Sequence, residues 1–127
     1  MDVVVGYDGS DASKRALALA AKLAVDGRLT VVNVAPALRF GFPDPLFAQE
    51  QEALLEEARR LLDERARTET VSAVGDAAHE LVEAAAAAGA QLLAVGTHVR
   101  GAVGRFVLGS VSLAVAREAP CSVLLVP

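Results

Sequence analysis

The segment 96–110, GTHVRGAVGRFVLGS, contains the residues whose types and spacing most clearly suggest chemistry. It holds four glycines, two arginines and one histidine, and no Asp or Glu occurs anywhere from residue 84 to residue 116. Glycines let backbone N–H groups approach an anion, and the free N–H groups at a helix start carry partial positive charge. The segment is therefore interpreted as a phosphate-binding loop. The alternative is that the glycines only form turns and that the arginines are solvated.

Three familiar site motifs do not fit. GRFVLGS, which starts at Gly104, has the glycine spacing of a P-loop but lacks the lysine that would reach the outer phosphates. Gly101 and Gly104 lack the first glycine of the dinucleotide fingerprint, and Ser110 lacks the glycine that follows the serine of a nucleophile elbow. His79 and His98 have no metal-ligand spacing, so no zinc site is expected. Because no acid–base pair or activated nucleophile is visible, the sequence favours binding over catalysis.

Short apolar strands that alternate with amphipathic helices must position this loop. Strands are predicted at residues 3–5, 29–34, 70–74, 92–95 and Ser122–Val126. Helices are predicted from a Ser10 cap to Gly27, at 49–67, at Ala77–Ala88 after an Asp76 cap, and from a Ser110 cap to Arg117. Segment 35–47, rich in Pro and Phe, is predicted to be a loop or lid. This order predicts an α/β fold, an open doubly wound parallel sheet with helices on both faces.

In such a sheet, ligands bind beyond the carboxyl ends of the strands, near the point where the strand order reverses. The loops after the first, second and fourth strands are therefore the candidate site. They contain Asp8, Gly9 and Ser10, then Val34, and then the glycine-rich segment. The alternatives are that Asp8 is a turn residue, that Val34 belongs to the core, and that Ser110 only caps a helix.

The overall composition limits the class of protein. A chain of 127 residues with 54% hydrophobic residues suits one domain, 1–127, with a sizeable core. A formal net charge of −4 and 4% aromatic residues argue against a nucleic-acid binder. No apolar run approaches the ~20 residues of a membrane span, and no signal-like segment is visible. Together with a single cysteine, Cys121, these features predict a cytoplasmic protein in a reducing compartment.

Two parts of the chain resemble the universal stress protein family. VVVGYDGSDASKRALALAAKLA, from residue 3, resembles the opening strand, turn and helix of that family. GTHVRGAVGRFVLGSVSLAVAREAPCSVLLVP, from residue 96, resembles its closing third. The resemblance implies a five-stranded parallel sheet with strand order 3-2-1-4-5. It also implies, for one branch of the family, ATP bound between the loops that follow the first and fourth strands.

That ATP-binding branch has a motif of glycine, two residues, glycine, nine residues, glycine, and then serine or threonine. Gly96, Gly109 and Ser110 match this motif, but Val99 replaces its middle glycine. A residue with a side chain in a left-handed backbone conformation costs ~1–2 kcal/mol, which is about tenfold in affinity. Val99 is therefore expected to lower the affinity for nucleotide, and the expected fold is unchanged.

The resemblance also implies roles for individual residues. Asp8 would contact the adenosine portion, Val34 would offer backbone contacts to adenine, and Gly109 with Ser110 would hold phosphate. Arg100 and Arg105 are added as phosphate neighbours because of their charge. Mg²⁺ or Mn²⁺, where present, would bind only through phosphate. The full expected nucleotide-binding set is Asp8, Gly9, Ser10, Val34, Gly96, Thr97, His98, Val99, Arg100, Gly101, Gly109, Ser110 and Val111.

The predicted function is that of a stress-response protein that binds ATP or another adenine nucleotide and acts as a sensor or switch, with at most slow ATP hydrolysis. The alternative, motivated by Val99, is a nucleotide-free family member that works through protein contacts. A phosphoryl-accepting receiver domain shares the α/β order, but the chain has no lysine near its last strand. Asp76, the only mimic of an acceptor aspartate after the third strand, fits a helix N-cap better.

The last predicted strand, Ser122–Val126, is apolar on both faces. If it lies at the edge of the sheet, its unpaired backbone groups would accept another strand. The sequence therefore predicts a symmetric homodimer in which two such strands pair antiparallel, as the family resemblance also implies.

Overall fold

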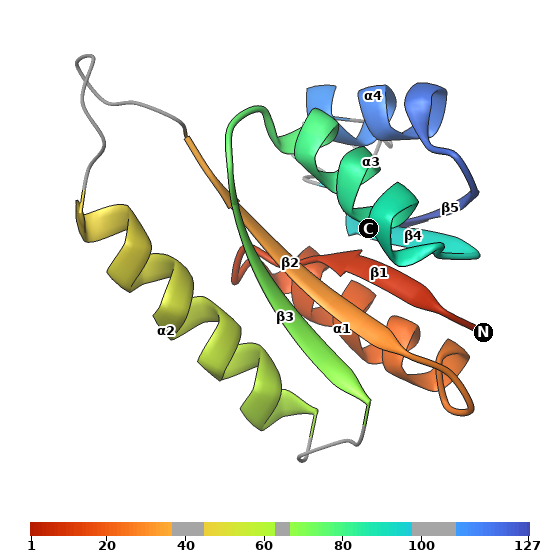
Figure 1. Cartoon of the computed structure of the whole chain (residues 1–127), viewed down its shortest axis with the longest axis horizontal. Helices are drawn as coiled ribbons and strands as arrows, with labels where there is room; N and C mark the ends of the chain where they lie inside the picture. Colours follow the sequence, from red (N-terminus) through yellow and green to blue (C-terminus); the bar gives the residue numbers. More distant parts are fainter. Residues whose placement is uncertain (37–44, 63–66, 98–108) are drawn as a thin grey trace, which may run out of the picture.

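A computed structural model describes residues 1–36, 45–62, 67–97 and 109–127. Its centre is a five-stranded, all-parallel sheet in the order β3-β2-β1-β4-β5 (Figure 1). The predicted α/β fold and the strand order implied by the family resemblance are both confirmed. The strands are β1 (Val3–Gly6), β2 (Leu29–Ala35), β3 (Thr68–Val74), β4 (Leu92–Gly96) and β5 (Ser122–Val126).

Helices cover both faces of the sheet. The described residues form α1 (Asp11–Leu23), α2 (Pro45–Leu61), α3 (Ala77–Ala88) and α4 (Ser110–Glu118). Helices α1 and α2 pack on one face, and α3 and α4 pack on the other (Figure 1). Because successive side chains of a strand point to opposite faces, Val3 and Val5 join the core under α1 and α2, and Val4 joins the core under α3 and α4. None of the helices in the described residues is long and apolar enough to cross a membrane.

Local capping signals fix the ends of two helices. Ser10 caps α1, because its Oγ accepts a hydrogen bond from Ser13 N at 3.2 Å. Asp76 caps α3 in the same way, accepting from His79 N at 3.0 Å. Gly89 ends α3 in the left-handed conformation that favours glycine, with φ of 59°. The predictions made for these positions are confirmed.

Other boundaries differ from the predicted ones. Helix α4 begins at Ser110 and Gly109 takes the N-cap position without a side-chain hydrogen bond, so the prediction that Ser110 caps this helix is wrong. Helix α2 begins at Pro45, so residues 45–47 belong to it and not to the predicted loop. Proline suits the first position of a helix, where its missing N–H would have no intrahelical partner. Strand β3 begins at Thr68, so the predicted helix does not extend to residue 67. The rest of the predicted loop or lid, residues 37–44, lies outside the described residues.

The strand order reverses at β1, which lies between β2 and β4. The chain leaves β1 through α1 and forms β2, the neighbour of β1 on one edge. After β3 it passes through α3 and forms β4, the neighbour of β1 on the other edge. At such a reversal the loops at the carboxyl ends of the two neighbouring strands diverge and leave a crevice. In the described residues, the turn that follows β1 and the carboxyl end of β4 at Gly96 border this crevice.

Candidate functional site

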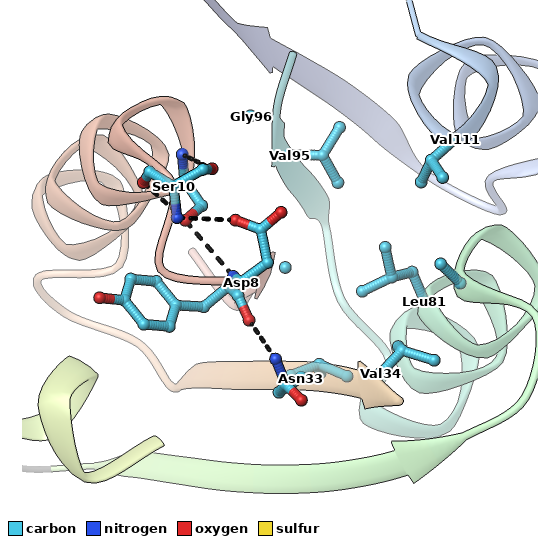
Figure 2. Close-up of a pocket in the computed structure, with 13 residues that line it drawn as sticks. Asp8, Ser10, Asn33, Val34, Leu81, Val95, Gly96 and Val111 are labelled. Atoms are coloured by element: carbon cyan, nitrogen blue, oxygen red, sulfur yellow. Dashed lines mark hydrogen bonds between the residues drawn. The ribbon is translucent and has the colours of Figure 1, made fainter. Parts of the chain in front are cut away.

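A pocket of about 180 Å³ lies at the carboxyl ends of β1, β2 and β4. The turn between β1 and α1 and residues of α1, α3 and α4 complete its lining (Figure 2). The pocket therefore lies where an open parallel sheet binds its ligands. Of the residues expected to bind a nucleotide, the structure brings together Asp8, Ser10, Val34, Gly96 and Val111.

Gly6 lines the pocket, and a side chain at this position would crowd its apolar lining. Along β1, Val4 fills the core on the side of α3 and α4, and Gly6 is the next residue that faces this side. A Cβ on Gly6 would lie 3.2 Å from Leu81 Cδ2 and 3.6 Å from Val95 Cγ1. The φ of Gly6 is not positive, so the backbone itself does not require glycine there. Glycine therefore lets Leu81 and Val95 pack closely against the end of β1 beside the pocket.

One side of the pocket is apolar. Val34 at the end of β2, Leu81 of α3, Val95 of β4 and Val111 of α4 converge on it, opposite the turn that carries Asp8 (Figure 2). Val111 is 38% exposed, although it is a large apolar residue. A flat group with apolar faces, such as a nucleobase, could pack on this wall. Removing those faces from water would favour binding.

The opposite side of the pocket is polar and comes from the turn between β1 and α1. Asp8 Oδ1 accepts a hydrogen bond from Ser10 N at 2.9 Å, and Asp8 N donates to Ser13 Oγ at 3.3 Å. Ser13 Oγ in turn donates to Ser10 O at 2.9 Å. These bonds set the direction in which Asp8 presents its carboxylate to the pocket (Figure 2). An ionised carboxylate only accepts hydrogen bonds, so it suits a ligand that carries hydroxyl groups.

Asn33 connects β2 to this turn. Asn33 lines the pocket and is buried, and its Nδ2 donates to Tyr7 O at 2.8 Å, directly before Asp8 (Figure 2). Tyr7 N donates to Val32 O at 2.8 Å, so the pairing of β1 with β2 continues one residue beyond β1. Both backbone polar groups of Tyr7 are thus held by β2, and Asp8 follows from a fixed point.

The side chain of Tyr7 is buried on the other face of the sheet, in the core under α1 and α2. Its hydroxyl donates to Glu57 Oε1 of α2, and Lys14 Nζ of α1 lies 3.9 Å from the same oxygen. Burial raises the pKa of the Tyr7 phenol well above its ordinary value, and the hydrogen bond to Glu57 and the charges of Glu57 and Asp8 raise it further. The hydroxyl therefore stays protonated and remains a donor.

Helix α4 differs from α1 and α3 at its N-terminus. Helix α1 has the Ser10 cap and Asp11 in its first turn, and α3 has the Asp76 cap and Glu80. Helix α4 has neither a side-chain cap nor an acidic residue in its first turn. Its first N–H groups and its dipole therefore favour an anion. A Cβ on Gly109 would meet nothing within 4 Å among the described residues.

Gly96, the first glycine of the ATP-binding motif, and its neighbour Thr97 both have roles in packing the sheet. A Cβ on Gly96 would lie 2.6 Å from Ala12 C and 2.6 Å from Ser13 N, so glycine allows α1 to pack closely on β4. Thr97 is buried and its N donates to Val126 O at 2.7 Å, which ties the end of β4 to β5. Gly96 lines the pocket, whereas Thr97 does not.

Gly9 lies in the turn with φ of 82°, in the region that side chains rarely adopt. A Cβ there would also lie 2.8 Å from Leu54 Cδ2 of α2. Gly9 does not line the pocket, and neither do Gly109 and Ser110 at the start of α4, although the next residue, Val111, does.

The middle of the glycine-rich segment is outside the described residues. His98, Val99, Arg100 and Gly101 of the expected set lie there, and so does Arg105. Among the residues that the structure does describe, no three His, Cys, Asp or Glu side chains lie close enough together to hold a metal ion.

Sequence reasoning missed eight of the thirteen residues that line the pocket, and three of these are instructive: Gly6, Asn33 and Leu81. Asn33 had a visible signal, since it is the one amide in the strand sequence LTVVNVA and a buried amide needs a hydrogen-bond partner. Gly6 and Leu81 had none. A glycine at the end of a strand and a leucine on the apolar face of a helix are ordinary in sequence, and their meeting depends on the arrangement of the sheet.

The fold and the pocket define a class of protein: a doubly wound α/β protein with a ligand pocket where the strand order reverses. The sequence profile of the Universal stress protein family matches residues 1–127. The chain belongs to the universal stress protein family.

Relatives of known sequence or structure are similar over nearly the whole chain. The Thermus aquaticus protein named "Universal stress protein in QAH/OAS sulfhydrylase 3'region" is 36% identical, over 98% of this chain and 96% of that protein. The universal stress protein of Archaeoglobus fulgidus in complex with dAMP is 26% identical, with a TM-score of 0.82 and coverage of 100% and 98%. A universal stress protein in complex with cAMP is 33% identical, with a TM-score of 0.77 and coverage of 100% and 96%.

Proposed function

We propose that this stress protein binds an adenine nucleotide in the pocket at the ends of β1, β2 and β4 and acts as a nucleotide-dependent sensor or switch. The observation that carries the proposal is the meeting of an apolar wall and the Asp8 carboxylate in one pocket, next to the uncapped start of α4, whose second residue, Val111, lines that pocket. These groups match the needs of a base, a sugar and a phosphate, respectively. In this proposal the whole chain, 1–127, works as one nucleotide-binding domain.

Each part of the ligand has a proposed partner. The base packs on the apolar wall, with Val34 at its edge, and a sugar hydroxyl donates to Asp8. The phosphate accepts hydrogen bonds from the first N–H groups of α4, beside Gly109 and Ser110. Arg100 and Arg105 of the glycine-rich segment are proposed as further phosphate neighbours. Nothing in this arrangement acts as a nucleophile or an acid–base pair, so binding rather than catalysis is proposed.

A nucleotide with one phosphate is the favoured ligand. Two relatives have been solved with cAMP and with dAMP, which both carry a single phosphate. In the motif of the ATP-binding branch, Val99 stands where a glycine is expected, and a side chain costs affinity where such a motif needs a left-handed backbone. ATP, with Mg²⁺ or Mn²⁺ held only through its phosphates, is the weaker candidate.

Calorimetric titration of nucleotide-free protein with AMP, dAMP, cAMP, ATP with Mg²⁺, and GMP tests this function. We expect one saturable site for an adenine nucleotide and weaker binding of GMP. Asp8→Asn keeps an acceptor for Ser10 N but removes the charge, and should weaken binding about tenfold or more. Asp11→Asn changes an exposed carboxylate of α1 outside the pocket and is the matched control. The proposal is rejected if no adenine nucleotide binds and none is released from heat-denatured, freshly purified protein.

We also propose that two copies of the chain form a homodimer through β5. In the described residues, β5 lies at the edge of the sheet and pairs only with β4, so one side of its backbone is open to another strand. Its side chains Val123, Leu124 and Leu125 are only half-buried. Sedimentation equilibrium should give twice the mass of the chain, and a monomer at micromolar concentration would contradict this assembly.

A further inference from the structure

Helix α2 contributes no residue to the pocket in the described part of the chain, yet it contacts the turn that presents Asp8. Glu57 Oε1 accepts a hydrogen bond from the hydroxyl of Tyr7, the residue before Asp8. Leu54 lies against Gly9, the residue after it, so closely that a Cβ there would be 2.8 Å from Leu54 Cδ2. The turn is therefore packed against α2 on both sides of Asp8.

A second connection from α2 to the same turn runs through β2. Gln51 is 5% exposed, and its Nε2 donates to Asn33 O at 3.1 Å and to Ala73 O at 2.8 Å. These carbonyls belong to the ends of β2 and β3. Asn33 in turn donates through its side chain to Tyr7 O. Removing the partner of a buried polar group costs free energy. A shift of α2 would break both connections and would carry this cost at each of them.

We propose that α2 regulates the occupancy of the pocket: its contacts with Tyr7 and Asn33 hold the Asp8 turn in the conformation that binds ligand. A displacement of α2 then weakens ligand binding, and by thermodynamic reciprocity a bound ligand stabilises α2. The inference rests on the proposed function for the identity of the ligand. The link between α2 and the turn is a property of the free protein and is tested without ligand.

The first experiment measures amide hydrogen exchange in the free protein. Glu57→Leu removes the acceptor of the Tyr7 hydroxyl, and Glu57→Gln keeps one. Glu56→Leu is the matched control, since this neighbouring carboxylate of α2 faces the groove between α2 and β3 instead. In Glu57→Leu the amides of residues 7–10 should exchange on the order of fivefold faster relative to that of Leu93 in β4, and not in the other two variants. Equal exchange in all variants overturns the proposal.

The second experiment measures AMP affinity by calorimetry in the same variants and in Tyr7→Phe, which removes the donor and replaces Glu57→Leu if that variant does not fold. Both Glu57→Leu and Tyr7→Phe should raise the Kd for AMP on the order of fivefold, with Glu56→Leu and Glu57→Gln unchanged. AMP should also slow the exchange of α2 amides in the unmodified protein. Unchanged Kd values overturn the role of α2 while the proposed function stands. If the unmodified protein binds no adenine nucleotide, the proposed function fails, and exchange at residues 7–10 alone decides whether α2 holds the turn.

Discussion

At the scale of single residues, Gly6 is the lining residue at which an added side chain should perturb the pocket most directly. We predict that Gly6→Val lowers adenine nucleotide affinity by about tenfold or more, because the valine would collide with Leu81 and contact Val95, which line the pocket. The free energy of unfolding should fall by only about 1–3 kcal/mol, the usual cost of overpacking. Calorimetric titration measures the first effect and urea denaturation the second.

Gly6→Ala provides the graded control for this prediction. Its Cβ would lie 3.2 Å from the flexible end of Leu81, which needs to move only slightly, so a smaller loss of affinity is expected. If Gly6→Val binds nucleotide as well as the unmodified protein does, the ligand does not occupy this pocket.

A second residue-scale prediction concerns Val99, which lies outside the described residues. Val99→Gly restores the glycine spacing of the ATP-binding motif, with Gly96, Gly109 and Ser110 already in place. We expect the affinity for ATP to rise about tenfold, because glycine removes the cost of a side chain at a position where the ATP-binding motif has none. The affinity for AMP should change less, since its one phosphate is proposed to bind at the start of α4. Titration of both variants with both nucleotides measures this. Binding that appears only in Val99→Gly would instead support a nucleotide-free native protein, and equal ATP affinity in both would show that Val99 does not limit binding.

At the scale of helices and strands, the sequence predicted best what short-range interactions decide. Ser10 and Asp76 each precede a helix whose N–H groups their side chains can reach, and both cap as predicted. The start of α2 was missed, because Pro45 marks a first helical turn as readily as it marks a loop. The start of α4 was shifted by one residue, because serine suits a cap and the glycine before it was assigned to the loop.

Helix α1 has a side-chain cap at Ser10 and helix α4 has none, and this difference gives an element-scale prediction. Ser10→Ala removes the side-chain acceptor for Ser13 N and should lower the free energy of unfolding by about 1 kcal/mol. Ser110→Ala should change it by less than about 0.5 kcal/mol, because Ser110 is exposed and makes no capping hydrogen bond. Urea denaturation of the two variants checks the contrast. Equal losses would mean that Ser110 also caps its helix in solution.

At the scale of the whole molecule, the sequence predicted the layered α/β architecture, but the order of the strands came from the family resemblance. Alternating strands and helices restrict the fold to a parallel sheet, and several strand orders satisfy that pattern. The position of the pocket followed once the order was known. Its lining did not, because Gly6, Asn33 and Leu81 are far apart in sequence and meet only in the complete fold.

The buried Tyr7 makes the stability of the whole molecule depend on pH in the alkaline range. Its pKa is raised in the folded protein, so the folded state holds the phenolic proton to higher pH than the unfolded state, whose pKa is about 10. The stabilisation is therefore complete below about pH 10 and is lost as the pH rises above it, by at most about 1.4 kcal/mol per pH unit. Urea denaturation from neutral to alkaline pH should show this loss relative to Tyr7→Phe, in which it is absent. Because Tyr7 is the only tyrosine, phenolate absorbance reports its ionisation directly. Ionisation of the folded protein at the ordinary pKa, or equal pH dependence of the two proteins, would show that the Tyr7 hydroxyl is not held between the sheet and α2.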